Sequence, residues 1–389
     1  MELTDKEQRM LDGESGEAKQ TAMEILAALG RIYGAKKMIP VSSAQVAGVS
    51  YKTIGDAGME YLEHMAASGA KVSIPTFLNP AGMDIQQWKE MGIPAGFAVK
   101  QLRILDAYHK MGIMASYTCT PYLVGIRPGR GEHIAWAESS AIAFANSVLG
   151  ARTNREGGPS ALCAGICGVT PYYGLHLDEN RVAKVKVKVE AKLKSDNDYG
   201  AMGYFIGEKA GNEYPAFSGI KPDETQLKLL GAAMAASGAV PLFYVKGVTP
   251  EYLVSKDAKE IVFSESDLKK TKERIDSGEK PDLVTLGCPH ASIEEIKRIA
   301  EVVQKKKPTC GFWVCTARKT KEEAERRGYG KIIKENGGIL VADTCMVVCP
   351  LEEMGFKITG ANSGKAAKYL PSMCKQKVAF GDIEDILYR

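Results

Sequence analysis

The sequence predicts an α/β protein of several lobes, built from βα units with mostly parallel sheets. Short apolar runs rich in β-branched residues alternate with longer stretches of helical periodicity, and this alternation occupies both halves of the chain. The length points the same way, because 389 residues exceed the roughly 250–300 that one hydrophobic core accommodates. We therefore expect an N-terminal lobe at residues 1–200 and a C-terminal lobe at residues 201–389.

The N-terminal half begins with helices. Thr4 and Glu7 have the spacing of a capping box, which predicts a first helix, and a second amphipathic helix ends near Gly34. An alanine-rich run at residues 132–149, closed by Gly150, predicts one long buried helix. Between these helices we expect strands at residues 37–42, 72–77 and 113–119, and helices at residues 58–68, 85–89 and 97–110.

The C-terminal half repeats the alternation. Strands are expected at residues 240–245, 283–288, 311–315 and 338–342, and helices at residues 224–236, 265–277, 293–306 and 321–328. Before them, Val185, Val187 and Val189 alternate with lysines, which predicts a strand with one exposed face. We expect this strand to be antiparallel or to lie at a sheet edge, because parallel strands are ordinarily buried on both faces.

The charge balance gives no sign of two classes of partner. With 51 basic and 47 acidic residues and a net charge of +4, neither a nucleic-acid groove nor a membrane surface is indicated, whereas small anionic substrates fit. The acidic N-terminus has no basic n-region, and no run of about 18 apolar residues occurs, so we expect a cytoplasmic protein. Nine cysteines, an odd number, fit a reducing compartment in which thiols bind metal or pack.

Three cysteines fall where predicted strands end. Cys119, Cys288 and Cys345 each follow an apolar run at the edge of an open α/β sheet where ligands and cofactors collect. Three thiolates at one edge suggest a metal cluster. A 4Fe-4S cluster held by three cysteines leaves one iron open, and that iron can act as a Lewis acid on a hydroxyl or carboxylate.

The other cysteines leave alternatives open. Cys315 also ends a predicted strand, so spacing alone favours it almost as much as Cys288, and Cys349 lies four residues beyond Cys345. No C-x-x-C pair occurs, which removes ferredoxin and zinc-ribbon signatures. We expect packing roles for Cys163 and Cys167, and Cys310 and Cys374 have no supporting context.

The motifs around these cysteines resemble those of the large, catalytic subunit of the aconitase X family, and the likeness covers nearly the whole chain. The most specific blocks are Thr118-Cys119-Thr120-Pro121-Tyr122, Glu138-Ser139-Ser140, residues 145–160, Gly287-Cys288-Pro289-His290 and Asp343-Thr344-Cys345. The resemblance implies an aconitase-like fold and an iron-sulfur cluster, a 4Fe-4S cluster by the argument above, bound by Cys119, Cys288 and Cys345. Cys349 falls outside the implied set.

The resemblance also implies a dehydratase. One branch of the family removes water from 5-phosphomevalonate and is built from separate large and small subunits, whereas another removes water from cis-3-hydroxyproline. This separate, lysine-rich chain resembles the first branch more, which implies a place in an archaeal-type mevalonate pathway. A non-enzymatic scaffold that binds zinc or another metal through its thiols is the alternative from a different class.

A partner subunit is implied as well. Aconitase-type enzymes close a swivelling domain over the cluster, and no fitting segment follows Lys377. The resemblance implies that a small subunit supplies this domain, with a serine as the general base. We therefore expect a heterodimer or higher heteromer, no catalytic base in this chain, and no activity of the chain alone.

Nine residues are expected to bind the substrate, in four places. These are a loop whose successive backbone N–H groups could form an anion nest, an Asn-Pro pair just past a strand, a serine pair inside an apolar helix, and the N-terminus of a late helix that carries a lysine. Each place also has an ordinary interpretation as a turn or a cap. The nine residues are Gly48, Val49, Ser50, Asn79, Pro80, Ser139, Ser140, Gly364 and Lys365.

Three further residues have weaker indications. Arg152 and Arg155 lie in a polar cluster that is costly to bury, and salt bridges between lobes are one interpretation of them. His290, two residues after Cys288, is the histidine that we consider as a hydrogen-bond donor to a cluster sulfide.

Overall fold

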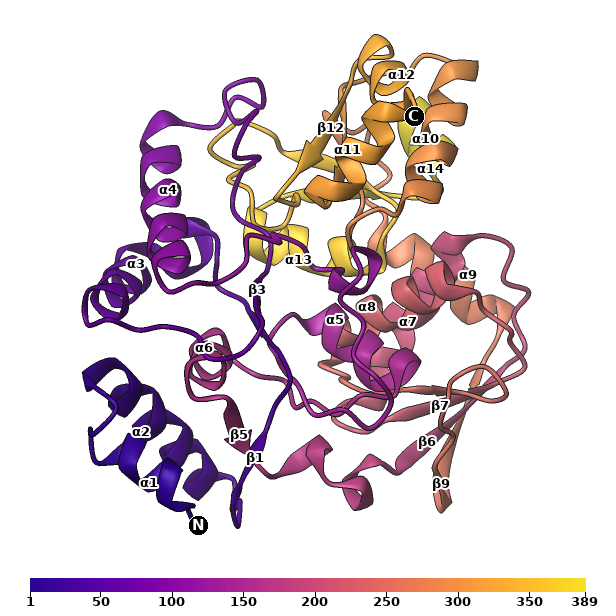
Figure 1. The fold of residues 1–389 in the computed structure, drawn as a ribbon. Helices are drawn as coiled ribbons and strands as arrows, with labels where there is room; N and C mark the ends of the chain where they lie inside the picture. The colour runs from indigo at the N-terminus through magenta and orange to yellow at the C-terminus, as the bar shows by residue number, and fades with distance from the viewer.

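Four sheets organise the chain in the computed structural model, which describes residues 1–389 (Figure 1). Three of the sheets are parallel, and helices connect most of their strands, so the predicted α/β class with mostly parallel sheets is confirmed. The fourth is an antiparallel pair, β1 and β5. None of the helices combines the length and the apolar character that crossing a membrane requires.

The N-terminal region, indigo to magenta in Figure 1, is built on a short parallel sheet of order β3-β2-β4. Its elements are α1 (Asp5–Leu11), α2 (Glu17–Ile32), β1 (Met38–Pro40), β2 (Ala44–Val46), α3 (Tyr51–Ala67), β3 (Thr76–Leu78), α4 (Ala95–Lys110), β4 (Ala135–Trp136), α5 (Ser139–Phe144), α6 (Gly158–Cys167) and β5 (Val169–Pro171). Helix α3 packs on α4, and α2 packs on α6. The capping box of Thr4 and Glu7 is present at α1, as predicted.

The strand predicted at residues 113–119 is wrong. One bridge, between Phe77 and Met114, joins this segment to β3. Beyond it, one backbone bond remains, from the Thr118 N–H to the Leu78 carbonyl at 3.1 Å, and the Ser116 hydroxyl accepts from the Leu78 N–H and donates to the same carbonyl. Tyr117 has a φ of 41°, which a strand does not allow. Cys119 therefore ends an irregular segment that runs beside β3.

The long helix predicted at residues 132–149 is also wrong. Its first part contains β4, which pairs with β2, and α5 begins only at Ser139. The Glu138 side chain caps α5 by accepting the Ser140 N–H at 3.3 Å. Residues 145–149 continue as a π turn, which Gly150 ends in a left-handed conformation. Ser139 and Ser140 thus begin a helix and do not interrupt one. The helix expected at residues 85–89 is also wrong, since these residues form a series of turns.

The middle region, pink to orange at the lower right of Figure 1, forms a parallel sheet of order β8-β7-β6-β9. Its elements are β6 (Ala183–Val189), α7 (Asp196–Ala210), β7 (Pro215–Ser218), α8 (Glu224–Gly238), β8 (Tyr244–Val245), β9 (Val254–Phe263) and α9 (Glu265–Ile275). Residue 200 lies inside α7, and the division into two lobes at that residue stays a prediction.

Strand β6 differs from its prediction in one respect. Its exposed face is confirmed, since Lys184 and Lys188 are exposed while the valines between them are buried with side chains of α7 and α8. However, β6 is an interior strand that pairs in parallel with both β7 and β9. The prediction of an antiparallel or edge strand is therefore wrong. Helices α7 and α8 lie over one face of this sheet (Figure 1), and the lysine face is left in contact with solvent.

The C-terminal region, orange to yellow in Figure 1, contains a five-stranded parallel sheet of order β12-β11-β10-β13-β14. Its elements are β10 (Leu283–Leu286), α10 (Ile293–Lys305), β11 (Phe312–Thr316), α11 (Arg318–Arg326), α12 (Tyr329–Glu335), β12 (Gly338–Ala342), β13 (Ile358–Ala361), α13 (Gly364–Cys374), β14 (Lys377–Phe380) and α14 (Ile383–Tyr388). Helices α10, α12 and α14 cover one face, and α13 covers the other. The three strands predicted here form within two residues of their expected bounds.

Candidate active site

A cavity of about 340 Å³ lies between the N-terminal and C-terminal regions. Cys119, Cys288 and Cys345 all line it. Of the nine residues predicted to bind substrate, seven line the same cavity, and Ser140 and Gly364 do not. The seven are Gly48, Val49, Ser50, Asn79, Pro80, Ser139 and Lys365.

The three cysteines reach the cavity from different elements. Cys288 follows β10 and Cys345 follows β12, and the ends of these parallel strands lie at one edge of the C-terminal sheet. Cys119 comes from the irregular segment beside β3 in the N-terminal region. The arrangement joins residues that are far apart in the sequence.

The other cysteines do not line the cavity. Cys315 is fully buried within β11, and neither it nor Cys349 lines the cavity. Burial raises the pKa of the Cys119, Cys288 and Cys345 thiols, and the nearby Lys365 cation opposes this rise in each of them. Burial also raises the pKa of Cys315, where neighbouring thiols add to the rise. Lys365 is thus a leading influence on the three cavity thiols, whereas other thiols are the leading charges that act on Cys315.

His290 is fully buried and touches the loops of all three cysteines. Its Nε2 lies 2.9 Å from the Thr344 carbonyl oxygen and its Nδ1 lies 3.0 Å from Thr118 Oγ1. Burial lowers the pKa of His290 to about 4, so the ring is neutral, Nε2–H donates to the carbonyl and Nδ1 accepts from the hydroxyl. Both ring nitrogens are thus engaged. The hypothesis that the ring donates to a sulfide is wrong, and the backbone N–H donates instead to Cys119 Sγ at 3.3 Å.

Glu138 is the functional residue that sequence reasoning missed. Its carboxylate is buried at the cavity wall, where it accepts from Asn79 Nδ2 at 2.7 Å, from Ser140 Oγ at 2.9 Å and from Lys365 Nζ. Burial raises the pKa of Glu138, but Lys365 and these hydrogen bonds outweigh it and the pKa is lowered. The pKa of Lys365 is raised because the attraction of Glu138 outweighs burial. The two groups form an ionised pair.

One sequence signal could have identified Glu138. It directly precedes the serine pair, in a stretch that is otherwise alanine-rich and apolar. Glutamate is not a preferred N-cap residue, and a buried carboxylate needs partners. Its main partner, Lys365, lies 227 residues away, so the pairing itself was not visible in the sequence.

The Gly48–Ser50 loop presents unpaired backbone donors to the cavity. The carbonyls of Gly48 and Val49 accept from the side chains of Tyr108 and Gln101, at 3.1 and 2.8 Å. The Ser50 hydroxyl caps α3 at 3.2 Å and donates to the Val348 carbonyl at 2.8 Å. The N–H groups of Gly48, Val49 and Ser50 have no hydrogen-bond partner in the protein. Successive N–H groups without a protein partner, in a loop that lines the cavity, are the kind of donors that bind anions.

The N-terminus of α13 divides its roles among three residues. Ser363 caps the helix by accepting the Ala366 N–H at 3.2 Å. A Cβ on Gly364 would lie 2.4 Å from the Gly200 carbonyl oxygen, so the glycine permits close packing of α13 on α7. Lys365 alone of these residues lines the cavity.

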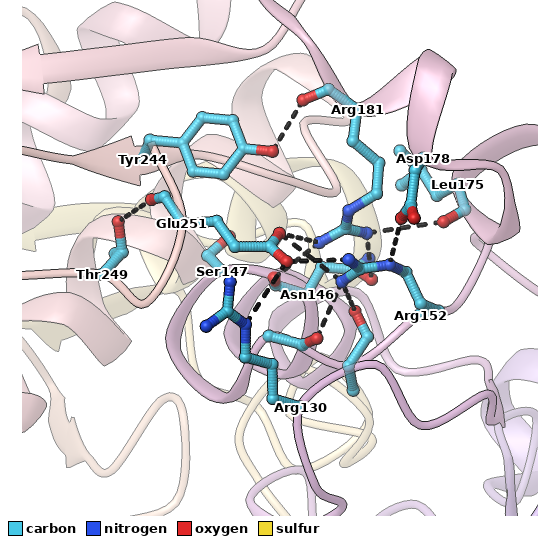
Figure 2. A network of polar contacts seen from close by, with 12 residues as sticks. Arg130, Asn146, Ser147, Arg152, Leu175, Asp178, Arg181, Tyr244, Thr249 and Glu251 are labelled. Carbon is cyan, nitrogen blue, oxygen red and sulfur yellow. Dashed lines mark hydrogen bonds and ion pairs between the residues drawn. The ribbon is translucent and has the colours of Figure 1, made fainter. Parts of the chain in front are cut away.

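Arg152 belongs to a second buried cluster, which Figure 2 shows. Its guanidinium contacts Glu251 at 2.7 Å and Asp178 at 2.9 Å, and the fully buried Arg181 contacts Glu251 at 3.3 Å. Arg152 therefore does bridge the N-terminal and middle regions by salt bridges. Arg155 is exposed and donates only to the Ala239 carbonyl, at 3.1 Å. We call Arg152, Arg181 and Glu251 the arginine network, and none of its members lines the cavity.

Comparison with known proteins shows the family of the chain. Models of the first, second and third domains of aconitase X match residues 1–179, 183–273 and 281–389. The chain belongs to the aconitase X family. A solved structure of aconitase X from Thermococcus kodakaraensis, in its holo form, superposes with a TM-score of 0.94 at 47% identity and covers 100% of this chain and 99% of that chain. The aconitase-like fold that the motifs implied is thereby confirmed.

Curated relatives come from two groups of enzymes. The phosphomevalonate dehydratase large subunit of Methanothermobacter thermautotrophicus is 53% identical over 97% of this chain and 95% of its own length. That of Methanocaldococcus jannaschii is 51% identical over 100% of this chain and 99% of its own length. The cis-3-hydroxy-L-proline dehydratase of Pseudomonas aeruginosa is 35% identical over 97% of this chain and 68% of its own length.

Proposed function

We propose that the chain is the large subunit of an iron-sulfur hydro-lyase that dehydrates (R)-5-phosphomevalonate to trans-anhydromevalonate 5-phosphate. One observation carries the proposal: a single cavity in which three buried thiols face a buried lysine and three unpaired backbone N–H groups. Full-length relatives of about half identity that bear the name phosphomevalonate dehydratase large subunit support the same chemistry. The donors suit a substrate that is anionic at both ends.

The thiol set fits an iron-sulfur cluster better than a single metal ion. Three thiols surround the cavity, yet no three His, Cys, Asp or Glu side chains lie close enough together to hold one ion. A zinc ion would need its ligands about 2.0–2.3 Å from one point. A 4Fe-4S cluster distributes its thiolates over separate irons, and with three thiolates it leaves one iron open. We therefore propose Cys119, Cys288 and Cys345 as its ligands. When bound, the cluster would supply a Lewis acid for the departing hydroxyl.

The chain's own residues would anchor the substrate. Lys365 and the free N–H groups of the Gly48–Ser50 loop offer two sites for negative charge, which matches a carboxylate at one end and a phosphate at the other. Glu138 fixes Lys365 in position. Hydroxyproline would bring a secondary ammonium group into a cavity whose one carboxylate is already paired. The charges therefore favour the phosphorylated acid.

The general base is proposed to come from a partner. The residues that line the cavity include no histidine, and their one carboxylate, Glu138, is held by Lys365 and by neutral donors. The wall thus offers neither a histidine nor a free carboxylate, the side chains that most often act as a general base, to the carbon next to the substrate carboxylate. The relatives are named large subunits, which implies a second subunit in those enzymes. We propose that a small subunit covers the cavity, excludes water and delivers the base.

Anaerobic reconstitution tests this proposal. The chain is loaded with iron and sulfide, mixed with the proposed small subunit, and offered 5-phosphomevalonate or cis-3-hydroxyproline. We expect the pair to dehydrate 5-phosphomevalonate and the chain alone to be inactive. If the pair preferred cis-3-hydroxyproline, the proposed substrate would be wrong and the proposed iron-sulfur chemistry would stand. If the chain were colourless and bound zinc but no iron, both the substrate and the chemistry would be wrong.

A further inference from the structure

The three proposed ligand loops lack a common backbone ladder. Strand β11 lies between β10 and β12, so the loops that carry Cys288 and Cys345 are not on neighbouring strands. Cys119 comes from a different region, in a segment without regular secondary structure. Three thiols must nevertheless sit at fixed positions to share one cluster. The sheet sets Cys288 relative to Cys345 through β11, and the N-terminal region reaches the Cys345 loop by a backbone bridge between Ala81 and Thr344. No backbone–backbone hydrogen bond joins the Cys119 loop to either of the other two, so side chains supply that contact.

We infer that His290 is the positioning residue that holds the three cysteine loops in register for the cluster, an inference that rests on the proposed function. The residue before Cys119 and the residue before Cys345 each bond one nitrogen of its ring, at 3.0 and 2.9 Å. His290 itself lies two residues after Cys288, and its backbone N–H contacts Cys119 Sγ. One side chain therefore joins all three loops.

The direction of these hydrogen bonds is determined by the groups involved. The Thr344 carbonyl can only accept, so His290 Nε2 carries the hydrogen and Nδ1 is free to accept from the Thr118 hydroxyl. Thr118 Oγ1 in turn accepts from the Thr120 N–H at 3.1 Å. The bonds thus form one chain, in which the imidazole both donates and accepts. An aliphatic side chain offers neither function, and a glutamine would have to place its amide where the two ring nitrogens lie.

The middle region also contacts His290, through its backbone carbonyl. Lys228 is buried on α8, where it pairs with Glu295 and donates to the His290 carbonyl at 3.3 Å. His290 thereby receives contacts from the N-terminal, middle and C-terminal regions. Any buried histidine needs hydrogen-bond partners, but the ring partners of this one are the residues directly before Cys119 and Cys345.

His176 is the matched control. It is also buried, with 2% of its surface exposed against 0% for His290. Its Nδ1 lies 2.9 Å from Nδ1 of His133, and it does not line the cavity. The test compares His290→Gln and Thr118→Val with His176→Gln in the full chain. Thr118→Val leaves the histidine in place and removes only the hydroxyl that its Nδ1 accepts from, so it serves if His290→Gln does not fold.

Two measurements decide the inference. In the chain without iron, mass spectrometry follows alkylation of Cys119, Cys288 and Cys345, with Cys163 as the internal reference. In the chain reconstituted with iron and sulfide, the rate of iron loss to a chelator and the EPR spectrum are recorded. We expect both test variants to lose iron about 10–100 times faster than the wild type, with altered EPR spectra and faster alkylation of the three thiols. His176→Gln should match the wild type in all three.

Three results would overturn the inference. One is iron loss and alkylation at wild-type rates in His290→Gln and Thr118→Val. Another is equal acceleration in His176→Gln at the same loss of melting temperature, which would make His290 an ordinary core histidine. If the wild type itself bound no iron, the proposed function would fail and the inference with it. If instead the wild type bound iron and the two variants held it as tightly, the proposed function would stand and only the inference about His290 would fail.

Discussion

The cavity and the arginine network both bury charged side chains where regions of the chain meet, yet they serve different purposes. In the arginine network, Glu251 is held between Arg152 and Arg181 (Figure 2), and no member lines the cavity. At the cavity, the Glu138–Lys365 pair stands on a wall shared with three thiols. Buried charge by itself therefore does not identify a reactive site. The candidate site is distinguished by a cavity with unpaired donors and three thiols around that charge.

The largest expected effect comes from the thiols. Cys119→Ser, Cys288→Ser and Cys345→Ser should each lose most of the iron, because each removes one of the three proposed ligands. Cys163→Ser, Cys167→Ser and Cys374→Ser should keep it, and so should Cys315→Ser, which has no access to the cavity. Iron and acid-labile sulfide per chain, measured after anaerobic reconstitution, give the comparison. Full colour in Cys288→Ser, or its loss in Cys315→Ser alone, would reassign the ligands.

The arginine network should affect stability without affecting chemistry. Glu251→Gln leaves two buried guanidinium groups without their shared carboxylate, and such a loss costs about 3–5 kcal/mol. Denaturant unfolding should show this loss, while the KM for the substrate stays at the wild-type value. A raised KM in Glu251→Gln with no loss of stability would contradict the division between the two clusters.

Lys365 should show the opposite behaviour. A charge-assisted contact contributes about 1.5–3 kcal/mol, so Lys365→Ala should raise the KM at least tenfold and leave the cluster spectrum unchanged. Some stability is lost too, since Glu138 is left buried without its cation. Steady-state kinetics and the absorption spectrum of the same preparation separate the two effects. Unchanged kinetics would make the Glu138–Lys365 pair structural, like the arginine network.

The contribution of Glu138 to stability should depend on pH. Its folded-state pKa is lowered from the ordinary value of 4.5, so its stabilising contribution is present above that pH and is lost as pH falls through the folded-state pKa. The stability difference between wild type and Glu138→Gln should therefore be largest near pH 7 and shrink below pH 4.5. Thermal unfolding of the iron-free chain across this range measures it. A difference that does not vary with pH would show that Glu138 is not ionised in the folded chain.

Local sequence patterns predicted the strands of the C-terminal sheet better than they predicted which residues come together in the fold. The strands that precede Cys288 and Cys345 were predictable, because apolar runs and the edge rule for parallel sheets depend on local pattern. The position of Cys315 was not, since spacing does not tell a residue inside β11 from one beyond its end. Its exclusion from the cavity needed coordinates.

The errors share one physical cause. Alanine-rich composition predicted a helix through residues 132–149, but the pairing of β4 with β2 and the cap from Glu138 depend on partners that local pattern does not show. Likewise, Ser116 and Tyr117 end a strand through a side-chain bond and a backbone angle that propensity does not register. Glu138 itself was missed because its cation lies on α13. Long-range contacts decided each case.

Turnover by three chains side by side tests the central claim most directly. Wild type, Cys345→Ser and Glu251→Gln are each reconstituted with the small subunit, and formation of the dehydrated product from 5-phosphomevalonate is followed by phosphorus NMR at a temperature where all three are folded. We predict product from wild type and from Glu251→Gln at the same KM, and none from Cys345→Ser. Product from Cys345→Ser at the wild-type rate, with loss of turnover in Glu251→Gln, would contradict the assignment of the chemistry to the cavity.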